Sequence, residues 1–218
     1  VGFLIEPIQG EGGVVVPDDG YLTNCKKLCE KYNILFIADE IQTGVCRTGE
    51  LLACHHESIK ADITILGKAL AGGFYPVSGV LTSKNIMDVM KVGQHGSTFG
   101  GNPLACVVAK EAIKFAIENN LSQKAHKLGL IFRNYLTDQI ENLPIVKSVR
   151  GKGLLNAIVL NCHVNSEIPW NICLSMRDNG LLAKPTQGNK IRFAPPLIIT
   201  EKQLFNSLKI IIKSLKNF

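Results

Sequence analysis

Apolar runs alternate with amphipathic segments over the first part of the chain. Short runs rich in Val, Ile, Leu and Phe predict buried strands in four places, at residues 1–5, 34–39, 61–66 and 77–83. Between the first two runs, apolar residues at helical spacing predict a helix that ends near Tyr32, with Asp18 and Asp19 as its caps. Strands that alternate with helices and are too apolar for a one-faced sheet indicate a mostly parallel α/β domain.

The second half of the chain has a different pattern. Two long helices are expected at 103–120 and 121–142, and Pro103 opens the first of them. After Pro144, short strands with Gly and Asn turns are expected within 146–160 and 181–197, and helices near 170–179 and 201–216. We therefore expect part of a large domain over residues 1–143 and a small α+β domain over residues 144–218.

Composition narrows the class of protein. The chain has 218 residues, of which 46% are hydrophobic and 19% charged, as in a globular protein with a sizeable core. The net charge is +6, but the lysines are scattered and form no block, so a nucleic-acid partner is not expected. No apolar run reaches the roughly 20 residues that cross a bilayer, so no membrane association is expected either.

Seven cysteines without a regular framework favour reduced thiols in an intracellular compartment. The chain opens on a strand-like run without Met, which is the pattern of a fragment whose N-terminal half is missing. No presequence is present, so the cytoplasm is the expected compartment. The mitochondrial matrix stays an alternative, because targeting information could have been lost.

One lysine lies inside an uncharged, glycine-bracketed run. Lys68 follows the strand-like segment "ADITILG" and precedes "ALAGG", so we expect a buried ammonium group. A buried charge without a partner costs several kcal/mol. Lys68 is therefore expected to be paired, neutralised or used chemically.

Acidic residues end two of the neighbouring strands. In an open α/β sheet, ligands bind outside the carboxyl ends of the strands, where Asp39, Glu6 and Glu11 are expected beside Lys68. A lysine amine and a carboxylate are what pyridoxal phosphate needs, the amine for a Schiff base and the carboxylate for the pyridine nitrogen. Such a charge pair at about 4 Å is worth roughly 4 kcal/mol at an effective dielectric near 20.

Simpler interpretations of the same residues remain. An Asp at a strand end is often only a helix cap, and Asp39 with Glu40 lacks the further ligands of a metal site. The run Cys54-His55-His56, even with Cys46, has the wrong spacing for zinc, so no metal is expected. "GKA" is not a P-loop, and "GEGGVV" lacks the third glycine of a dinucleotide-binding turn.

Five segments, taken in order, resemble a known family. They are "EPIQGEGG", "ADEIQTGVCRTG", "ILGKALAGGFYPVSGV", "HGSTFGGNPLA" and "RGKGLL", and they resemble the class III (omega-amino acid) aminotransferases. The resemblance spans nearly the whole chain. It implies pyridoxal 5'-phosphate as cofactor and the PLP-dependent transferase fold type I.

The resemblance also implies roles for individual residues. Lys68 forms the Schiff base and then moves the proton, Asp39 pairs with the pyridine nitrogen, Ile41 packs on the ring and Gln42 bonds the ring oxygen. Ser97 and Thr98 bind the cofactor phosphate of the neighbouring subunit, which implies a homodimer with shared active sites. The missing half normally supplies the phosphate cup, a ring-stacking aromatic and a second substrate arginine.

Two more residues concern the substrate. The segments "EPIQGEGGVVVPDDGYL", "HGSTFGGNPLA" and "IRFAPPLIIT" are most similar to the branch of the family that acts on ornithine. There Arg192 binds the carboxylate of glutamate or 2-oxoglutarate, and Glu11 masks that Arg while ornithine is bound, so the δ-amine reacts. The alternative is a static Glu11–Arg192 salt bridge that joins two domains.

Other functions stay open at this point. The branches that act on 4-aminobutyrate or acetylornithine share the same chemistry, with amino acid and 2-oxo acid substrates. A non-catalytic protein that keeps the fold is a further alternative, although Lys68, Asp39 and Thr98 are all intact. Cys25 and Cys29 stand one helical turn apart, which would suit a redox pair but is more typical of core-facing thiols.

Overall fold

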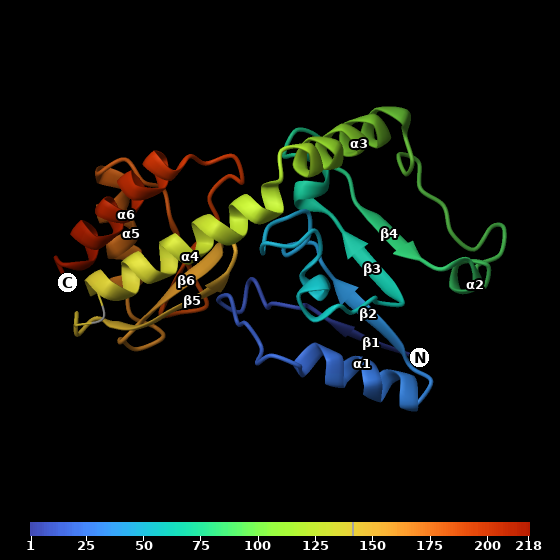
Figure 1. The fold of residues 1–218 in the computed structure, drawn as a ribbon, viewed down its shortest axis with the longest axis horizontal. Helices are drawn as coiled ribbons and strands as arrows, with labels where there is room; N and C mark the ends of the chain where they lie inside the picture. The colour runs from blue at the N-terminus through green and yellow to red at the C-terminus, as the bar shows by residue number, and fades with distance from the viewer. Residues whose placement is uncertain (141) are drawn as a thin grey trace. The chain divides into compact units, whose positions relative to one another are not determined.

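The computed structural model describes residues 1–140 and 142–218. The chain forms two compact units (Figure 1). Unit 1 comprises Val1–Pro7, Pro17–Cys46 and Glu50–Asn120. Unit 2 comprises Ile8–Val16, Arg47–Gly49 and Leu121–Phe218.

Unit 1 is built on a four-stranded sheet with the order β1-β2-β3-β4. The strands are β1 (Gly2–Ile5), β2 (Leu35–Asp39), β3 (Ile63–Leu66) and β4 (Gly79–Thr82). The first three strands are parallel and β4 is antiparallel to β3. All four predicted strands are confirmed, and so is the mostly parallel sheet.

Two helices of unit 1 were predicted, one of them with a different cap, and no bounds were predicted for its three short helices. The helices are α1 (Tyr21–Lys31), α2 (Lys84–Met87), α3 (Pro103–Glu118) and the short 3-10 helices η1 (Ala53–Glu57) and η2 (Lys68–Ala71). Pro103 opens α3, as predicted, and Asn102 caps it through a bond from the Ala105 amide. The predicted caps of α1 are wrong. Its N-cap is Gly20 at φ 84°, a left-handed conformation that glycine adopts without steric cost.

One face of this sheet forms the core of unit 1. Leu22 and Cys29 of α1 pack with Phe36 and Ala38 of β2 and with Cys54 of η1. Leu28 and Tyr32, which have helical spacing with these residues in the sequence, are exposed. Cys25 is half-buried and Cys29 is buried, and burial raises the pKa of the Cys29 thiol.

The expectation that β2 is buried on both faces is wrong for this chain. Phe36 and Ala38 are fully buried, whereas Leu35 and Ile37 are half-buried. Leu4, which pairs with Ile37 in the parallel register, is exposed. A continuous apolar run therefore does not by itself reveal how much of each face the rest of a chain covers.

Unit 2 has a four-stranded antiparallel sheet with the order β5-β6-β8-β7. Its elements are α4 (Leu121–Ile140), β5 (Val146–Lys152), β6 (Leu155–Leu160), α5 (Ile168–Asp178), β7 (Lys184–Thr186), β8 (Lys190–Phe193) and α6 (Glu201–Leu215). All of these were predicted. A capping box starts α6, because Thr200 Oγ1 accepts from the Gln203 amide and the Gln203 side chain accepts from the Thr200 amide.

The central strand β6 is buried along its whole length, because different layers cover its two faces. Ile158 and Leu160 point into the core that α4, α5 and α6 form with the sheet. Leu155 and Ala157 alternate with them and pack against Ile8 and Val14 of the segment Ile8–Val16. That segment therefore acts as the layer on the side of the sheet opposite the helices.

The two compact units divide the chain differently from the prediction of a boundary after residue 143. In the structure α4, which the prediction assigned to the first part, packs with unit 2. Ile8–Val16 and Arg47–Gly49 also pack with unit 2, although they lie far from it in the sequence. Long-range packing of this kind leaves no boundary signal in the sequence. The assignment of 1–143 and 144–218 to two domains stays a prediction.

The architecture is α/β in unit 1 and α+β in unit 2, which are the classes the sequence indicated. A search of the described residues for a helix both long and apolar enough to span a bilayer finds none.

Candidate active site

In unit 1, the two predicted catalytic residues follow neighbouring parallel strands. Asp39 is the last residue of β2 and pairs with Ile65 of β3. Strand β3 ends at Leu66, and Lys68, two residues later, begins η2. Both residues therefore follow the carboxyl ends of paired strands, as predicted, where open α/β sheets bind their ligands.

The backbone after β2 folds into a tight turn beside the end of β3. The Glu40 amide donates to the Ile65 carbonyl at 3.0 Å, which continues the ladder between the two strands. The Asp39 carboxylate accepts the Ile41 amide at 3.0 Å, and the Gly44 amide donates to the Glu40 carbonyl at 2.8 Å. These local bonds fix the backbone that carries Asp39, Ile41 and the half-buried Gln42.

Two glycines allow this turn to approach β3. A Cβ on Gly44 would lie 2.8 Å from the Glu40 carbonyl oxygen and 3.0 Å from a methyl group of Leu66. A Cβ on Gly67 would lie 3.4 Å from Cγ2 of Ile41, so the Ile41 side chain lies over the backbone that precedes Lys68. The turn that carries Asp39, Ile41 and Gln42 therefore meets the backbone before Lys68 at the ends of β2 and β3.

Lys68 itself is exposed in the structure, so the expectation of a buried ammonium group is wrong for this chain. The apolar strand before it is short and ends at Leu66, and the chain then turns into η2. Lys68 has φ 45°, in the left-handed region that residues with a Cβ seldom adopt. Such conformations are concentrated at functional sites, and here the amine is accessible to a ligand.

Glu40 is buried and is occupied by donors from the protein. Its carboxylate accepts the amides of Ala53 and Cys54, each at 2.9 Å, and the hydroxyl of Thr43. Burial and the negative charge of Glu40 raise the pKa of the Cys54 thiol. Glu40 therefore joins the turn after β2 to η1. Among the described residues, no group of three His, Cys, Asp or Glu side chains could hold a metal ion.

The cysteines of this region are packing residues. Cys46 and Cys54 are both buried.

Ser97 and Thr98 are exposed on the segment between α2 and α3. Ser97 Oγ accepts the amide of Gly100 at 2.9 Å, a local bond that shapes this segment. Their predicted role toward the phosphate of a neighbouring subunit stays a prediction.

In unit 2, the structure brings Glu11 and Arg192 together. Arg192 Nη1 lies 2.7 Å from Oε1 of Glu11, although the two residues are 181 positions apart in the sequence. The Arg192 side chain is 16% exposed and that of Glu11 is 56% exposed. The pair lies within one compact unit, so it does not join the two units. The guanidinium is held in place while the carboxylate is open to solvent.

Other positive charges lie on the same face of the sheet as Arg192. Lys184 of β7 is directly opposite Arg192 in the antiparallel register, and Lys190 is two residues before it on β8. Like charges opposite each other on a sheet are destabilising, and the carboxylate of Glu11 offsets this repulsion. A carboxylate of a substrate could do the same.

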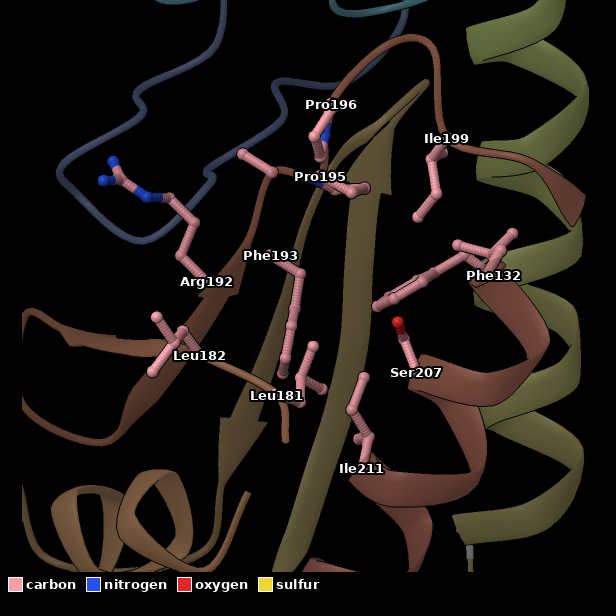
Figure 2. A pocket seen from close by; sticks show the side chains of 12 residues that line it. Phe132, Leu181, Leu182, Arg192, Phe193, Pro195, Pro196, Ile199, Ser207 and Ile211 are labelled. Carbon is pink, nitrogen blue, oxygen red and sulfur yellow. The ribbon is translucent and has the colours of Figure 1, made fainter. Parts of the chain in front are cut away.

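An apolar pocket of about 270 Å³ lies beside Arg192 (Figure 2). Its lining includes Phe132, Phe193, Ile199 and Ile211. The Arg192 guanidinium points away from these side chains, because Arg192 and Phe193 are successive residues of β8 and face opposite sides of the sheet. The pocket is therefore part of the core side of unit 2, and Arg192 is at its margin.

Arg47 organises the loop after β8. Its Nη1 donates to the carbonyls of Pro195 at 2.6 Å and Leu154 at 3.1 Å. Burial lowers the pKa of the Arg47 guanidinium to about 10. Its neighbour Thr48 is in close contact with Gly153, where a Cβ would lie 2.3 Å from the Thr48 carbonyl carbon.

Sequence reasoning missed three residues that position this site. Glu40 was considered only as half of a metal site, and Arg47 and Arg150 lie in the quoted segments but received no role. Arg150 donates two hydrogen bonds to the carbonyl of Gly13, two residues after Glu11. A basic residue beside glycines in a quoted segment was a usable signal for both arginines. Nothing in the sequence indicated that Glu40 would be buried.

Comparison with known proteins identifies the family. The profile of "Aminotransferase class-III" matches residues 1–215. The mitochondrial ornithine aminotransferase of Drosophila melanogaster is 54% identical over 215 residues, which are 98% of this chain and 48% of that protein. The chain thus spans about half the length of the curated relatives it matches.

Solved structures agree with the fold. The acetylornithine aminotransferase of Elizabethkingia anophelis superposes with a TM-score of 0.97 at 58% identity, over 100% of this chain and 54% of that one. An ornithine aminotransferase of Toxoplasma gondii, with PLP at partial occupancy in its active site, gives a TM-score of 0.95 at 46% identity. The match covers 99% of this chain and 50% of that one. The chain belongs to the class III aminotransferases and has the fold of these PLP-dependent enzymes.

Proposed function

We propose that the whole protein is a pyridoxal-phosphate-dependent aminotransferase that converts L-ornithine and 2-oxoglutarate to L-glutamate 5-semialdehyde and L-glutamate. The observation that carries the choice of substrate is the Glu11–Arg192 pair at 2.7 Å. The curated relatives named ornithine aminotransferase support it, at 54% identity for the Drosophila protein.

The residues of unit 1 fit the cofactor. Lys68 offers an exposed primary amine, Asp39 a carboxylate and Gln42 a carboxamide, all at the ends of the paired strands β2 and β3. These are the groups that can bind an aldehyde, an aromatic ring nitrogen and a ring oxygen. When bound, pyridoxal phosphate supplies an electron sink that stabilises negative charge next to the reacting amino group.

The chain's own groups supply the rest of the chemistry. Asp39 would hold the ring nitrogen of the bound cofactor in its protonated form, and its carboxylate accepts the Ile41 amide at 3.0 Å, which restricts its orientation. Lys68 Nζ would hold the cofactor aldehyde, and its freed amine is the group of this chain that would accept and return the proton of the amine-bearing carbon. Ile41, whose side chain lies over Gly67, would pack against the ring of the bound cofactor.

The Glu11–Arg192 pair decides which amine reacts. While Glu11 neutralises Arg192, the α-carboxylate of ornithine has no free cation there, and the distal δ-amine is the reactant. When Glu11 turns away, Arg192 holds a carboxylate of 2-oxoglutarate. The pair is partly open to solvent, and ion pairs of that kind contribute only about 0–1 kcal/mol, so a substrate carboxylate can displace Glu11.

Spectroscopy and kinetics test this function together. The purified whole protein is expected to absorb near 420 nm, as an enzyme with PLP bound to a lysine does, and to transaminate ornithine. Lys68→Ala is expected to remove the band and the turnover. A wild-type protein that is colourless yet fully active would overturn the assignment of Lys68.

A second candidate is the acetylornithine reaction. It is favoured by the 58% identity to the Elizabethkingia anophelis enzyme, which exceeds that to the Toxoplasma gondii structure. Relative kcat/KM values for ornithine, acetylornithine and 4-aminobutyrate decide between the candidates. A higher value for either alternative substrate would replace ornithine in the proposal.

The proposal includes a homodimer, in which Ser97 and Thr98 of one subunit bind the cofactor phosphate of the other. Analytical ultracentrifugation of the wild-type protein and of a Thr98→Val variant checks this arrangement. The variant is expected to remain a dimer with weakened cofactor binding.

The proposed compartment is the cytoplasm, with the mitochondrial matrix as the alternative, and the location of a fluorescent fusion distinguishes them.

A further inference from the structure

The segment that carries Glu11 is held along its backbone by side chains of the unit 2 sheet. Thr186 Oγ1, at the end of β7, donates to the carbonyl of Glu11 itself at 3.0 Å. Arg150 of β5 donates from Nε and Nη2 to the carbonyl of Gly13 at 3.1 and 2.8 Å. Thr186 is buried, which limits competition from water for this bond.

The register of the sheet explains why these side chains reach the same segment. Arg150 pairs with Ala157, Ala157 with Arg192, and Arg192 with Lys184, so all four project from one face. Thr186 is two residues after Lys184 on β7 and shares that face. The sheet thus presents Arg192 to the Glu11 carboxylate and, on both sides of it, donors to the backbone that carries Glu11.

Apolar contacts strengthen this attachment. Ile8 and Val14, at the two ends of the segment, are buried against Leu155 and Ala157 of β6. A Cβ on Gly13 would overlap the aliphatic stem of Lys190, so backbone and side chain are in direct contact there. The backbone is therefore fixed at several points, whereas the Glu11 side chain is 56% exposed.

We propose that Thr186 and Arg150 are positioning residues for substrate discrimination. They hold the main chain at Glu11 so that only its carboxylate rotates, and they return it to Arg192 after each turnover. This inference rests on the proposed function, because it assigns a role to residues behind the Glu11–Arg192 switch.

The expected effect follows from competition for Arg192. A tethered carboxylate competes with a free dicarboxylate through its effective concentration, which is highest when the tether is held at the correct span. Loss of one neutral hydrogen bond to a fixed carbonyl corresponds to a change of about threefold to tenfold in an equilibrium constant. Loosening the segment therefore lets a dicarboxylate bind more tightly and makes ornithine a poorer substrate.

The test uses the whole protein with cofactor bound and glutarate as an unreactive dicarboxylate. Thr186→Val removes the hydroxyl at nearly constant volume, and Thr186→Ser keeps it. We expect Thr186→Val to strengthen glutarate binding, measured by calorimetry, about threefold to tenfold. The KM for 2-oxoglutarate should fall with it, as should kcat/KM for ornithine, while Thr186→Ser restores the wild-type values.

Two further variants keep the test decisive. Glu11→Gln removes the competing charge and sets the largest gain in glutarate affinity that the pair can give. Arg150→Lys keeps the positive charge but not the two-pronged bond to Gly13, and it should shift glutarate binding in the same direction as Thr186→Val. If Thr186→Val does not fold, Arg150→Lys by itself tests the positioning role.

The outcomes separate this inference from the function on which it rests. If Glu11→Gln strengthens glutarate binding and neither Thr186→Val nor Arg150→Lys does, the positioning role is overturned and the proposed function stands. A lowered melting temperature with unchanged glutarate affinity also overturns it, since that is a purely structural role. If the wild-type protein does not transaminate ornithine, the proposed function itself fails.

Discussion

The two parts of the proposed chemistry are positioned in different ways. In unit 1, Asp39 and Lys68 follow paired parallel strands, and backbone hydrogen bonds and two glycines set their places. In unit 2, Glu11 and Arg192 come from segments 181 positions apart, and side chains of the sheet hold the backbone of the Glu11 segment.

The difference teaches what kind of change each region tolerates. A site placed by ladder bonds depends on backbone geometry, so it is sensitive to residues that alter the turn. A site placed by side chains that hold a distant backbone depends on single polar groups and on close packing beneath them. Substitutions in unit 1 should therefore act by changing the backbone of the turn, and substitutions in unit 2 by removing single polar groups or disturbing the close packing.

The largest expected effect tests the packing of the turn between β5 and β6 against Thr48. Gly153 has φ 55°, and an added Cβ would lie 2.3 Å from the Thr48 carbonyl carbon, which is backbone and cannot turn aside. Gly153→Ala is expected to lower the free energy of unfolding by ~3 kcal/mol or more, from a positive φ and a backbone clash. Denaturant unfolding of the protein measures it.

Gly180→Ala is the matched control for this prediction. Gly180 also has a positive φ, 92°, in the same unit, but nothing lies within 4 Å of an added Cβ. It should cost only about 1 kcal/mol, the strain of the backbone alone. Equal losses for both variants would show that the contact with Thr48 is not close in solution.

The next effect tests whether unit 1 also depends on one polar side chain. Glu40→Ala leaves the buried amides of Ala53 and Cys54 without their acceptor, and it is expected to cost ~3 kcal/mol of unfolding free energy. Glu40→Gln keeps one acceptor oxygen and should lose less. Because Glu40 anchors the turn after Asp39, cofactor affinity, measured by absorbance titration, should fall with stability. If Glu40→Ala keeps wild-type stability, backbone bonds alone hold this turn.

The smallest effect is a pH dependence in unit 1. Burial acts to raise the pKa of the Asp62 carboxyl, but hydrogen bonds from Lys26 and the Phe36 amide, with the Lys26 charge, lower it below its ordinary 3.8. A lowered carboxyl pKa in the folded state gives stability that is present above the ordinary pKa and lost as pH falls through the folded value.

Wild-type protein and Asp62→Asn should therefore differ by ~1 kcal/mol in unfolding free energy at pH 6, and by less below about pH 4. Urea titrations at pH 6, 4 and 3 measure this difference. A gap that widens as the pH falls has the wrong sign and would contradict the assignment.

Much of the fold was readable in the sequence. Apolar runs predicted the four strands of unit 1, short strands between Gly and Asn turns were expected in unit 2, and Pro103 marked the start of α3. The adjacency of Asp39 and Lys68 could be inferred because parallel strands carry their following residues to one edge of the sheet. These features depend on local pattern and on general rules of topology.

Other features required the tertiary structure. The α1 cap is Gly20 rather than an aspartate, because the chain enters the helix in a left-handed conformation. Lys68 is exposed although an apolar strand precedes it, and Leu28 is exposed despite its helical spacing with core residues. In each case the deciding factor is which other segment covers the residue, and the local sequence does not contain that information.

The sequence by itself determined the order of strands and helices and the strand ends where chemistry can occur, because these follow from side-chain periodicity and backbone geometry. Only the tertiary structure decided that Ile8–Val16 packs on the unit 2 sheet and that Thr186 and Arg150 hold it beside Arg192. The physical reason is that such contacts join residues far apart in the chain, and packing in three dimensions, rather than local pattern, selects them.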